Sequence, residues 1–151
     1  MIVRGKDAME SEAARFVATL LPRTDAATVV ALSGDLGAGK TAFVKGAAKA
    51  LGVTEHVTSP TFVIMKLYPL RGAFKQLVHI DAYRLKGEHH LKVLGWDDLV
   101  RDPTNLIFVE WPEEAGGAIP ASALRLTFRY SEDDGREIEY EVEGQEAVGT
   151  A

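Results

Sequence analysis

The chain has 151 residues, of which 46% are hydrophobic and 26% charged, and a formal net charge of −5, values that fit one globular domain with a buried core. It has no cysteine, which excludes disulfides and thiolate zinc sites, and its acidic balance without a cluster of lysines and arginines argues against a free-standing nucleic-acid binder. No apolar run has the length of a membrane span and the N-terminus lacks an apolar signal core, so we expect a cytoplasmic protein with no membrane partner.

The first elements are a helix and a strand. Asp7 and Glu10 have the spacing of a capping box, which predicts a helix from there to about Leu21. Residues 28–34, TVVALSG, form a nearly continuous apolar run that is rich in β-branched side chains. Such a run is typical of a strand that is covered on both faces.

A phosphate-binding motif follows this strand directly. Gly34, Gly39, Lys40 and Thr41 satisfy the P-loop pattern G-x-x-x-x-G-K-[ST], and apolar residues recur at helical spacing behind it. Glycines let a phosphate approach the backbone N–H groups, the lysine neutralises the β- and γ-phosphates, and the hydroxyl of Thr41 is a Mg²⁺ ligand. The predicted nucleotide-binding segment is Gly34, Asp35, Leu36, Gly37, Ala38, Gly39, Lys40, Thr41 and Ala42.

The rest of the chain predicts an α/β domain over residues 1–143, with 144–151 as a loose tail. We expect a P-loop NTPase-like central sheet, parallel in part and antiparallel at its C-terminal edge, with helices on both faces. The predicted elements are a strand that ends near Tyr68, strands at 76–81 and 105–110, one or two short helices over 88–100 interrupted at Gly95, and a hairpin of 124–130 with 136–142.

Two carboxylates end apolar strands of this sheet. Asp81 and Glu110 are therefore expected at the crevice at the carboxyl ends of parallel strands, where a carboxylate can have a metal-linked role. A helix cap or a surface acid would have the same pattern. His79 reads as a packed or partner-facing residue, and Trp111 fits the core and the cleft equally. Thr61 fits a loop that senses the γ-phosphate and, equally well, a local turn beside a proline.

Five segments in this order resemble the bacterial TsaE (YjeE) family. They are GDLGAGKTAFVKGAAKALG, VTSPTF, HIDAYRL, LGWDDL and IFVEWPE, which together span roughly residues 34–113. The resemblance implies a small P-loop protein that binds ATP and Mg²⁺ and hydrolyses ATP slowly alone. It also implies action with the TsaD and TsaB proteins, which transfer a threonylcarbamoyl group to adenosine 37 of tRNAs that read ANN codons. The ATPase would support turnover of that complex and meet tRNA only through it.

The resemblance also implies residue roles. Lys40 and Thr41 would act on phosphates and Mg²⁺, Glu110 would be the second metal-linked acid, and Asp81 would organise metal or water for hydrolysis. Thr61 matches the switch-like loop of the family, and Arg136 resembles a basic position whose role is open. One departure is Lys66, which stands shortly after SPTF where family members often have an acidic residue.

Two other functions fit the same motifs. A small P-loop kinase could use Asp81 as base and Arg84 on the transferred phosphoryl group, although 151 residues leave little room for an acceptor pocket. A nucleotide-gated interaction module would bind ATP and change a surface, with hydrolysis incidental. No [NT]-K-x-D segment is present, which disfavours a GTPase.

Overall fold

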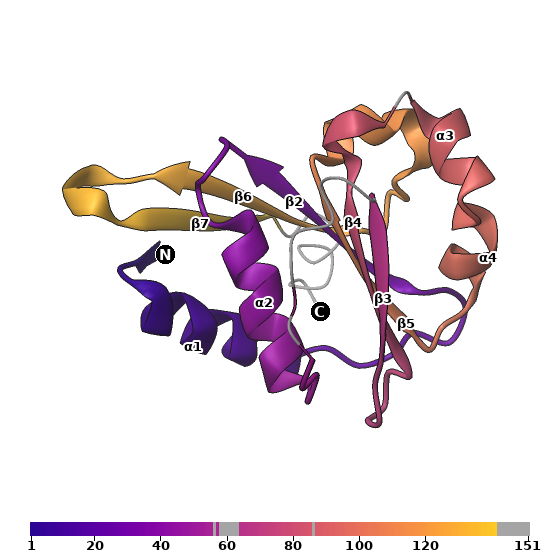
Figure 1. The fold of residues 1–151 in the computed structure, drawn as a ribbon, viewed down its shortest axis with the longest axis horizontal. Helices are drawn as coiled ribbons and strands as arrows, with labels where there is room; N and C mark the ends of the chain where they lie inside the picture. Colours follow the sequence, from indigo (N-terminus) through magenta and orange to yellow (C-terminus); the bar gives the residue numbers. More distant parts are fainter. Residues whose placement is uncertain (56, 58–63, 86, 142–151) are drawn as a thin grey trace, which may run out of the picture.

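The computed structural model describes residues 1–55, 57, 64–85 and 87–141. Seven strands form one sheet (Figure 1). They are β1 (Ile2–Val3), β2 (Thr28–Gly34), β3 (Met65–Pro69), β4 (Gln76–Asp81), β5 (Asn105–Glu110), β6 (Leu124–Tyr130) and β7 (Arg136–Glu141). Their order is β1-β7-β6-β2-β5-β4-β3. The strands β6, β2, β5 and β4 pair in parallel, which confirms the partly parallel sheet.

Helices cover both faces of the sheet, as the sequence predicts (Figure 1). One face packs against two long helices, and the other packs against two short helices and a helical loop. The elements are α1 (Lys6–Ala18), α2 (Lys40–Ala50), α3 (Glu88–Val93), α4 (Trp96–Arg101) and the helical segments η1 (Ala82–Arg84), η2 (Pro112–Ala118) and η3 (Glu132–Asp134). Within the described part of the chain, no helix is long and apolar enough to cross a membrane.

Two details of the elements differ from expectation. Helix α1 begins after Gly5, whose φ of 90° ends the preceding strand, and no side chain caps it; Asp7 lies in its first turn, so the capping box is wrong. The helix ends at Ala18 because the backbone N–H and the hydroxyl of Thr19 both bond to the carbonyl of Phe16. Leu21 beyond it is 77% exposed, so burial of apolar side chains would not stabilise a further helical turn.

The sheet is antiparallel at both edges and not at its C-terminal edge alone. Strand β7 pairs antiparallel with β6 and β1, which is the expected hairpin plus a short unexpected strand. Strand β3 pairs antiparallel with β4 at the opposite edge. The turn between β3 and β4 is short enough for a hairpin, whereas a parallel pair would need a crossover of a dozen or more residues.

The register of the parallel strands brings three chain segments to one edge. Asp81, the last residue of β4, is the direct neighbour of Glu110, the last residue of β5. Glu110 is also the neighbour of Leu32 in β2, two residues before the P-loop begins. The carboxyl ends of β2, β4 and β5 therefore meet where α2 begins.

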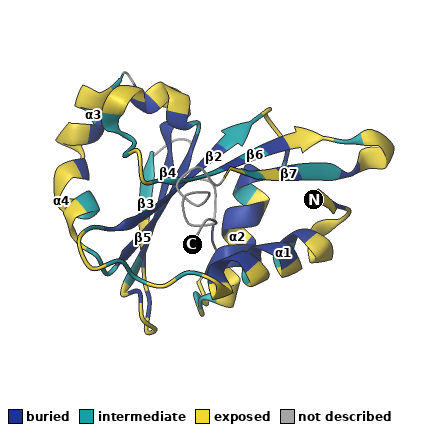
Figure 2. Cartoon of the chain, turned by 180° about the vertical axis from the view of Figure 1, so that it is seen from behind, coloured by how far each residue is buried: buried dark blue, intermediate teal, exposed yellow. Residues whose placement is uncertain are grey.

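Aromatic packing fixes the start of α2 on the sheet. The ring of Phe43 lies 5.7 Å from Phe16 of α1, 6.4 Å from Phe108 of β5 and 5.5 Å from Phe128 of β6. Phe43, Phe108 and Phe128 are fully buried, and Figure 2 shows the inner side of α2, β5 and most of β2 as buried. Such aromatic pairs contribute beyond their buried area, so the residues just after the P-loop are rigidly held.

A buried acid joins α1 to β7. The carboxylate of Glu12 accepts two hydrogen bonds from Arg15, at 2.9 and 2.5 Å, and one from the hydroxyl of Tyr140. Glu12 is only 4% exposed. Arg15 first, and Tyr140 in addition, lower the pKa of Glu12 against the opposing effect of burial. The charged form of Glu12 therefore stabilises the fold.

We expect Glu12→Gln to destabilise the protein by about 1.5–3 kcal/mol at neutral pH, the range for a hydrogen bond to a charged group. A depressed pKa in the folded state means that the contribution is complete above the unfolded pKa near 4.5 and disappears as the pH falls through the folded value. Urea denaturation at pH 7 and at pH values below 4 should therefore show a gap between wild type and variant that shrinks with acid.

The control is Glu139→Gln, on the strand that carries Tyr140. Glu139 bonds to Arg129 at 2.7 Å, but both side chains are about half exposed. An exposed pair contributes roughly 0–1 kcal/mol, so this variant should unfold close to wild type. A Glu12→Gln gap that stayed constant with pH would contradict the assignment.

Candidate functional site

The P-loop glycines are required by the protein's own packing as well as by close approach of a phosphate. Gly34 has a φ of 137°, and a Cβ there would lie 2.1 Å from the carbonyl oxygen of Phe128 in β6. Gly39 caps α2 with a φ of 113°, and its Cβ would lie 2.8 Å from the Cε of Met9 in α1. The backbone of the neighbouring strand therefore requires a glycine at position 34, and the positive φ favours one at position 39.

Lys40 is held inside the loop. Its ammonium donates to the carbonyls of Gly34 and Asp35 at 2.5 and 3.1 Å, and it lies 3.9 Å from the ring centroid of Trp111. Only 4% of Lys40 is exposed. Burial lowers the pKa of the Lys40 ammonium, and nearby carboxylates, Glu110 foremost, oppose that shift. The geometry places one cation at the start of α2, where a phosphate would meet the helix N-terminus.

Thr41 and Glu110 form the centre of the site. The hydroxyl of Thr41 lies 2.9 and 3.0 Å from the two carboxylate oxygens of Glu110. The Nε2 atom of His79 lies 2.6 Å from Oε2 of the same carboxylate. Sequence reasoning treated His79 as a packing or partner-facing residue and missed this contact. The signal that could have found it is the alternation in β4, which puts His79 and Asp81 on the same face of the sheet.

Asp81 caps a short helical segment and also lines the cleft; its metal-linked role stays a prediction. Its Oδ1 atom accepts a hydrogen bond of 3.0 Å from the backbone N–H of Tyr83 and so caps η1. The same residue is only 4% exposed and lines the cleft that also contains Lys40 and Glu110. A cap on a short helical segment therefore orients a carboxylate toward the site.

These groups line one cleft of about 320 Å³. Its lining residues are Leu36, Gly37, Gly39, Lys40, Thr41, Ala42, Asp81, Glu110 and Trp111. A larger cleft of about 670 Å³ shares Thr41 and Ala42 with it but contains neither Asp81 nor Glu110. The combination of one lysine, one hydroxyl and two carboxylates that phosphate chemistry requires is thus found in the smaller cleft.

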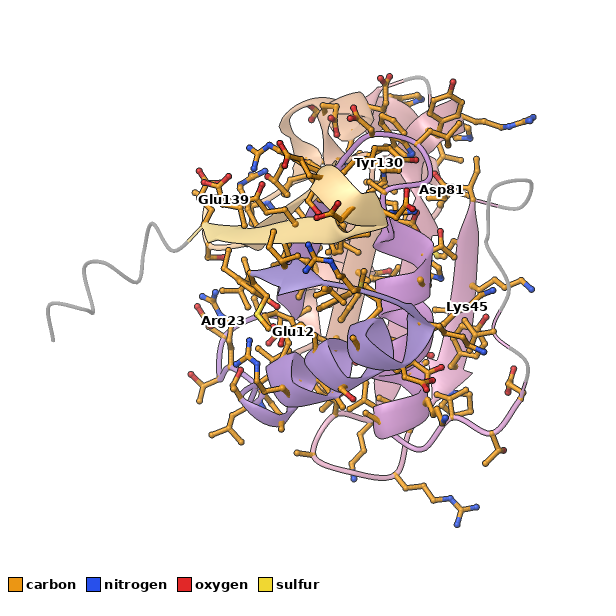
Figure 3. The ribbon with its side chains drawn as sticks, turned by 90° about the vertical axis from the view of Figure 1, so that its left-hand side faces the viewer. Glu12, Arg23, Lys45, Asp81, Tyr130 and Glu139 are labelled. Atoms are coloured by element: carbon orange, nitrogen blue, oxygen red, sulfur yellow. The ribbon has the colours of Figure 1, made fainter. Side chains whose placement is uncertain are left out.

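Four predicted residues that the structure describes lie outside this cleft. Gly34, Asp35 and Ala38 belong to the loop without lining the cleft, while Arg136 lines a neighbouring cleft of about 280 Å³ together with Gly37, Gly39 and Ala42. Figure 3 shows Tyr130 and Asp81 near the start of α2 and Lys45 farther along it. Thr61 lies outside the described residues, so its role stays a prediction.

Trp111 belongs to the cleft. Its backbone is left-handed, with φ of 59° and ψ of 52°, a conformation that costs a bulky residue about 1–3 kcal/mol. The backbone N–H donates to the carbonyl of Leu32 at 3.1 Å, and Tyr83 packs against the indole at 5.1 Å between ring centroids. The indole lies over the ammonium of Lys40 and also packs against the apolar cluster beneath α3 and α4.

The oxygen donors in the cleft fit Mg²⁺. Thr41 contributes a hydroxyl, and Glu110 and Asp81 contribute carboxylates, which are the hard ligands this ion prefers. In the described ranges, no group of three or more His, Cys, Asp or Glu is arranged to hold a metal. Mg²⁺ at phosphate sites takes one or two carboxylates and completes its shell with phosphates and water. The residues thus fit a cation that arrives with a nucleotide, with Thr41 and Glu110 as the side chains that would hold it.

Comparison with known proteins finds one family that matches most of the chain. The family model "Threonylcarbamoyl adenosine biosynthesis protein TsaE" matches residues 7–138. The TsaE protein of Streptomyces coelicolor is 43% identical over 116 residues, covering 76% of this chain and 75% of that protein. The TsaE protein of Bacillus subtilis is 39% identical, covering 77% of this chain and 70% of that protein.

A solved structure agrees with the sequence matches. The crystal structure of Bacillus subtilis YdiB superposes with a TM-score of 0.74 at 31% identity, covering 93% of this chain and 82% of that one. The resemblance noted in the sequence is therefore confirmed. The chain belongs to the TsaE family, proteins of tRNA threonylcarbamoyladenosine biosynthesis.

Proposed function

We propose that this protein is a Mg²⁺-dependent ATPase that works with the TsaB and TsaD proteins in forming threonylcarbamoyladenosine at position 37 of tRNAs that read ANN codons. In this proposal it drives repeated turnover of the complex, does not transfer the threonylcarbamoyl group itself, and acts in the cytoplasm. The observation that carries the proposal is the convergence of Lys40, Thr41, Asp81 and Glu110 on one cleft at the start of α2.

The cleft supports phosphate binding and hydrolysis through different groups. The N-terminus of α2 and the ammonium of Lys40 favour the phosphates, and Thr41 with Glu110 fits the metal. Asp81 lies beside Glu110 in the sheet register and has one carboxylate oxygen, Oδ1, bonded to the backbone of Tyr83. We assign Asp81 to metal or water orientation.

The nucleoside is assigned to the neighbouring cleft that contains Arg136. That cleft adjoins the phosphate cleft through Gly37, Gly39 and Ala42. Its apolar side comes from Met9, and its charged side from Lys6, Asp134 and Arg136. A hollow that joins an apolar wall to charged groups offers contacts to both a base and a sugar, which supports Arg136 as a nucleotide contact.

The partner proposal follows from family membership and from charge. A net charge of −5 opposes direct binding to tRNA, which a protein achieves through lysines and arginines on phosphates. A protein that reaches tRNA through TsaB and TsaD needs no basic surface of its own. Slow hydrolysis in isolation and faster hydrolysis in the complex are then expected, because the partners would complete or order the site.

We expect Lys40→Ala to abolish ATP hydrolysis, with a loss of about 10²-fold or more, because one preorganised electrostatic group in a phosphate-transfer site contributes that much. The measurement is phosphate release with and without the partner pair and tRNA. Lys45→Ala is the matched control, since Lys45 is an exposed lysine on the same helix. Hydrolysis that survives in Lys40→Ala, or that ignores the partners, would contradict the proposal.

Tryptophan emission should report nucleotide binding. The protein has two tryptophans, and the ammonium of Lys40 lies over Trp111, whereas Trp96 is buried on the other face and bonds to the carbonyl of Ala118. Phosphates that attract Lys40 will change the field at the indole of Trp111. Addition of Mg²⁺–ATP should change the emission of wild type and Trp96→Phe but not that of Trp111→Phe. A response that follows Trp96 would place the nucleotide elsewhere.

Arg136→Ala should weaken ATP binding by about tenfold, the effect of losing roughly 1–2 kcal/mol from one charge-assisted contact. The matched control is Arg129→Ala on the same hairpin, because Arg129 pairs with Glu139 and lies in neither cleft. Calorimetric titration of both variants with ATP and with triphosphate alone distinguishes contacts to the nucleoside from contacts to the phosphates. Equal losses for both ligands in Arg136→Ala would assign Arg136 to the phosphates instead of the nucleoside.

A further inference from the structure

His79 is a polar ring in an apolar layer. It is fully buried, and its β4 neighbour on the same face of the sheet is the buried Leu77. Phe108, also fully buried, is the adjacent residue in β5. An aliphatic or aromatic side chain would satisfy this packing. The presence of an imidazole here therefore needs a reason other than core formation.

The imidazole makes a single polar contact among the described residues. Its Nε2 atom lies 2.6 Å from Oε2 of Glu110, while Nδ1 has no hydrogen-bond partner in that part of the chain. A carboxylate only accepts, so Nε2 donates. Leaving a buried ring nitrogen without a partner costs free energy. The protein tolerates that cost at one atom while the other atom binds the acid of the candidate metal site.

The contact to Glu110 restricts how that carboxylate can turn. Oε2 is held by His79 from the side of β4, and both oxygens accept from Thr41 on the side of α2. Donors on two sides favour one orientation of the carboxylate, and Glu110 lines the cleft in that orientation. Groups that orient a metal ligand in this manner commonly change metal affinity by 10–100-fold when they are removed.

We infer that His79 is a positioning residue that sets the carboxylate of Glu110 for a divalent cation, an inference that rests on the proposed Mg²⁺–ATP function. It acts through Glu110 and touches neither nucleotide nor metal. Its contribution is orientation, so it acts on cation affinity in the presence of nucleotide and leaves metal-free nucleotide binding unchanged.

The variants His79→Gln and His79→Asn have the same amide group and differ in how far its nitrogen lies from the backbone. They therefore test whether the donor must reach Glu110. In glutamine the amide nitrogen is three bonds from Cβ, as Nε2 is in histidine, so His79→Gln keeps a donor facing Glu110. In asparagine the nitrogen is two bonds from Cβ, like Nδ1, so His79→Asn keeps a polar group and loses the contact. His79→Leu removes the donor and fills the layer.

The test uses Mn²⁺ as a paramagnetic substitute for Mg²⁺ and measures its affinity for the protein–ATP-analogue complex by electron paramagnetic resonance. His79→Leu and His79→Asn should weaken Mn²⁺ binding by about tenfold, and His79→Gln by less than about threefold. Analogue affinity in EDTA should match wild type in all three. Thermal unfolding of each variant identifies any that fails to fold, and the glutamine–asparagine pair remains informative if leucine is not tolerated.

The outcomes are distinct. Equal Mn²⁺ affinity in wild type, glutamine and asparagine variants would overturn the role of His79 and leave the proposed function intact. Loss of analogue binding in EDTA would assign His79 a structural role only. Failure of wild type itself to bind Mn²⁺ with the ATP analogue would contradict the proposed function, independently of His79.

Discussion

The hydrogen bonds between the hydroxyl of Thr41 and the carboxylate of Glu110, at 2.9 and 3.0 Å, connect residues that are 69 positions apart. They join the first turn of the P-loop helix to the end of β5. This contact requires that β2 and β5 run parallel in one register, that the loop between β2 and α2 be tight, and that α2 lie on the face to which Glu110 points. The sheet order and the aromatic packing around Phe43 supply those conditions.

The site concentrates features that reduce stability. Lys40, His79, Asp81 and Glu110 are each less than 5% exposed, although charged and polar side chains are rarely buried so fully. Trp111 adds a left-handed backbone to this group. The sheet and its helices compensate for this loss of stability, because the strands β2 and β5 bury apolar side chains on both faces. The pattern is that of a rigid scaffold that holds a costly arrangement in place, as binding sites require.

Local patterns predicted most of the fold, and long-range pairing decided the rest. The strands at 28–34, 76–81 and 105–110 and the helix break at Gly95 follow from periodicity and glycine chemistry, and the structure confirms each of them. The two-residue strand β1 has no such periodicity. It forms because it pairs with β7 at the edge of the sheet. The P-loop lysine and threonine follow from their motif. Alternation in β4 places His79 on the same face as Asp81, but the contact of His79 with Glu110 also depends on the register of β4 against β5, which no local pattern encodes.

The charges around Lys40 limit how an acidic protein of this kind could bind a phosphate ligand. Lys40 is one cation among carboxylates, and Glu110, Glu113, Asp81 and Asp35 all act on its pKa. Side-chain charge alone therefore disfavours a polyphosphate in this cleft. Attraction has to come from the N-terminus of α2 and from a cation that neutralises carboxylate and phosphate together. Under the proposed function, phosphate affinity would depend on this cation as well as on Lys40, so the orientation of Glu110 would affect the binding of both ligands.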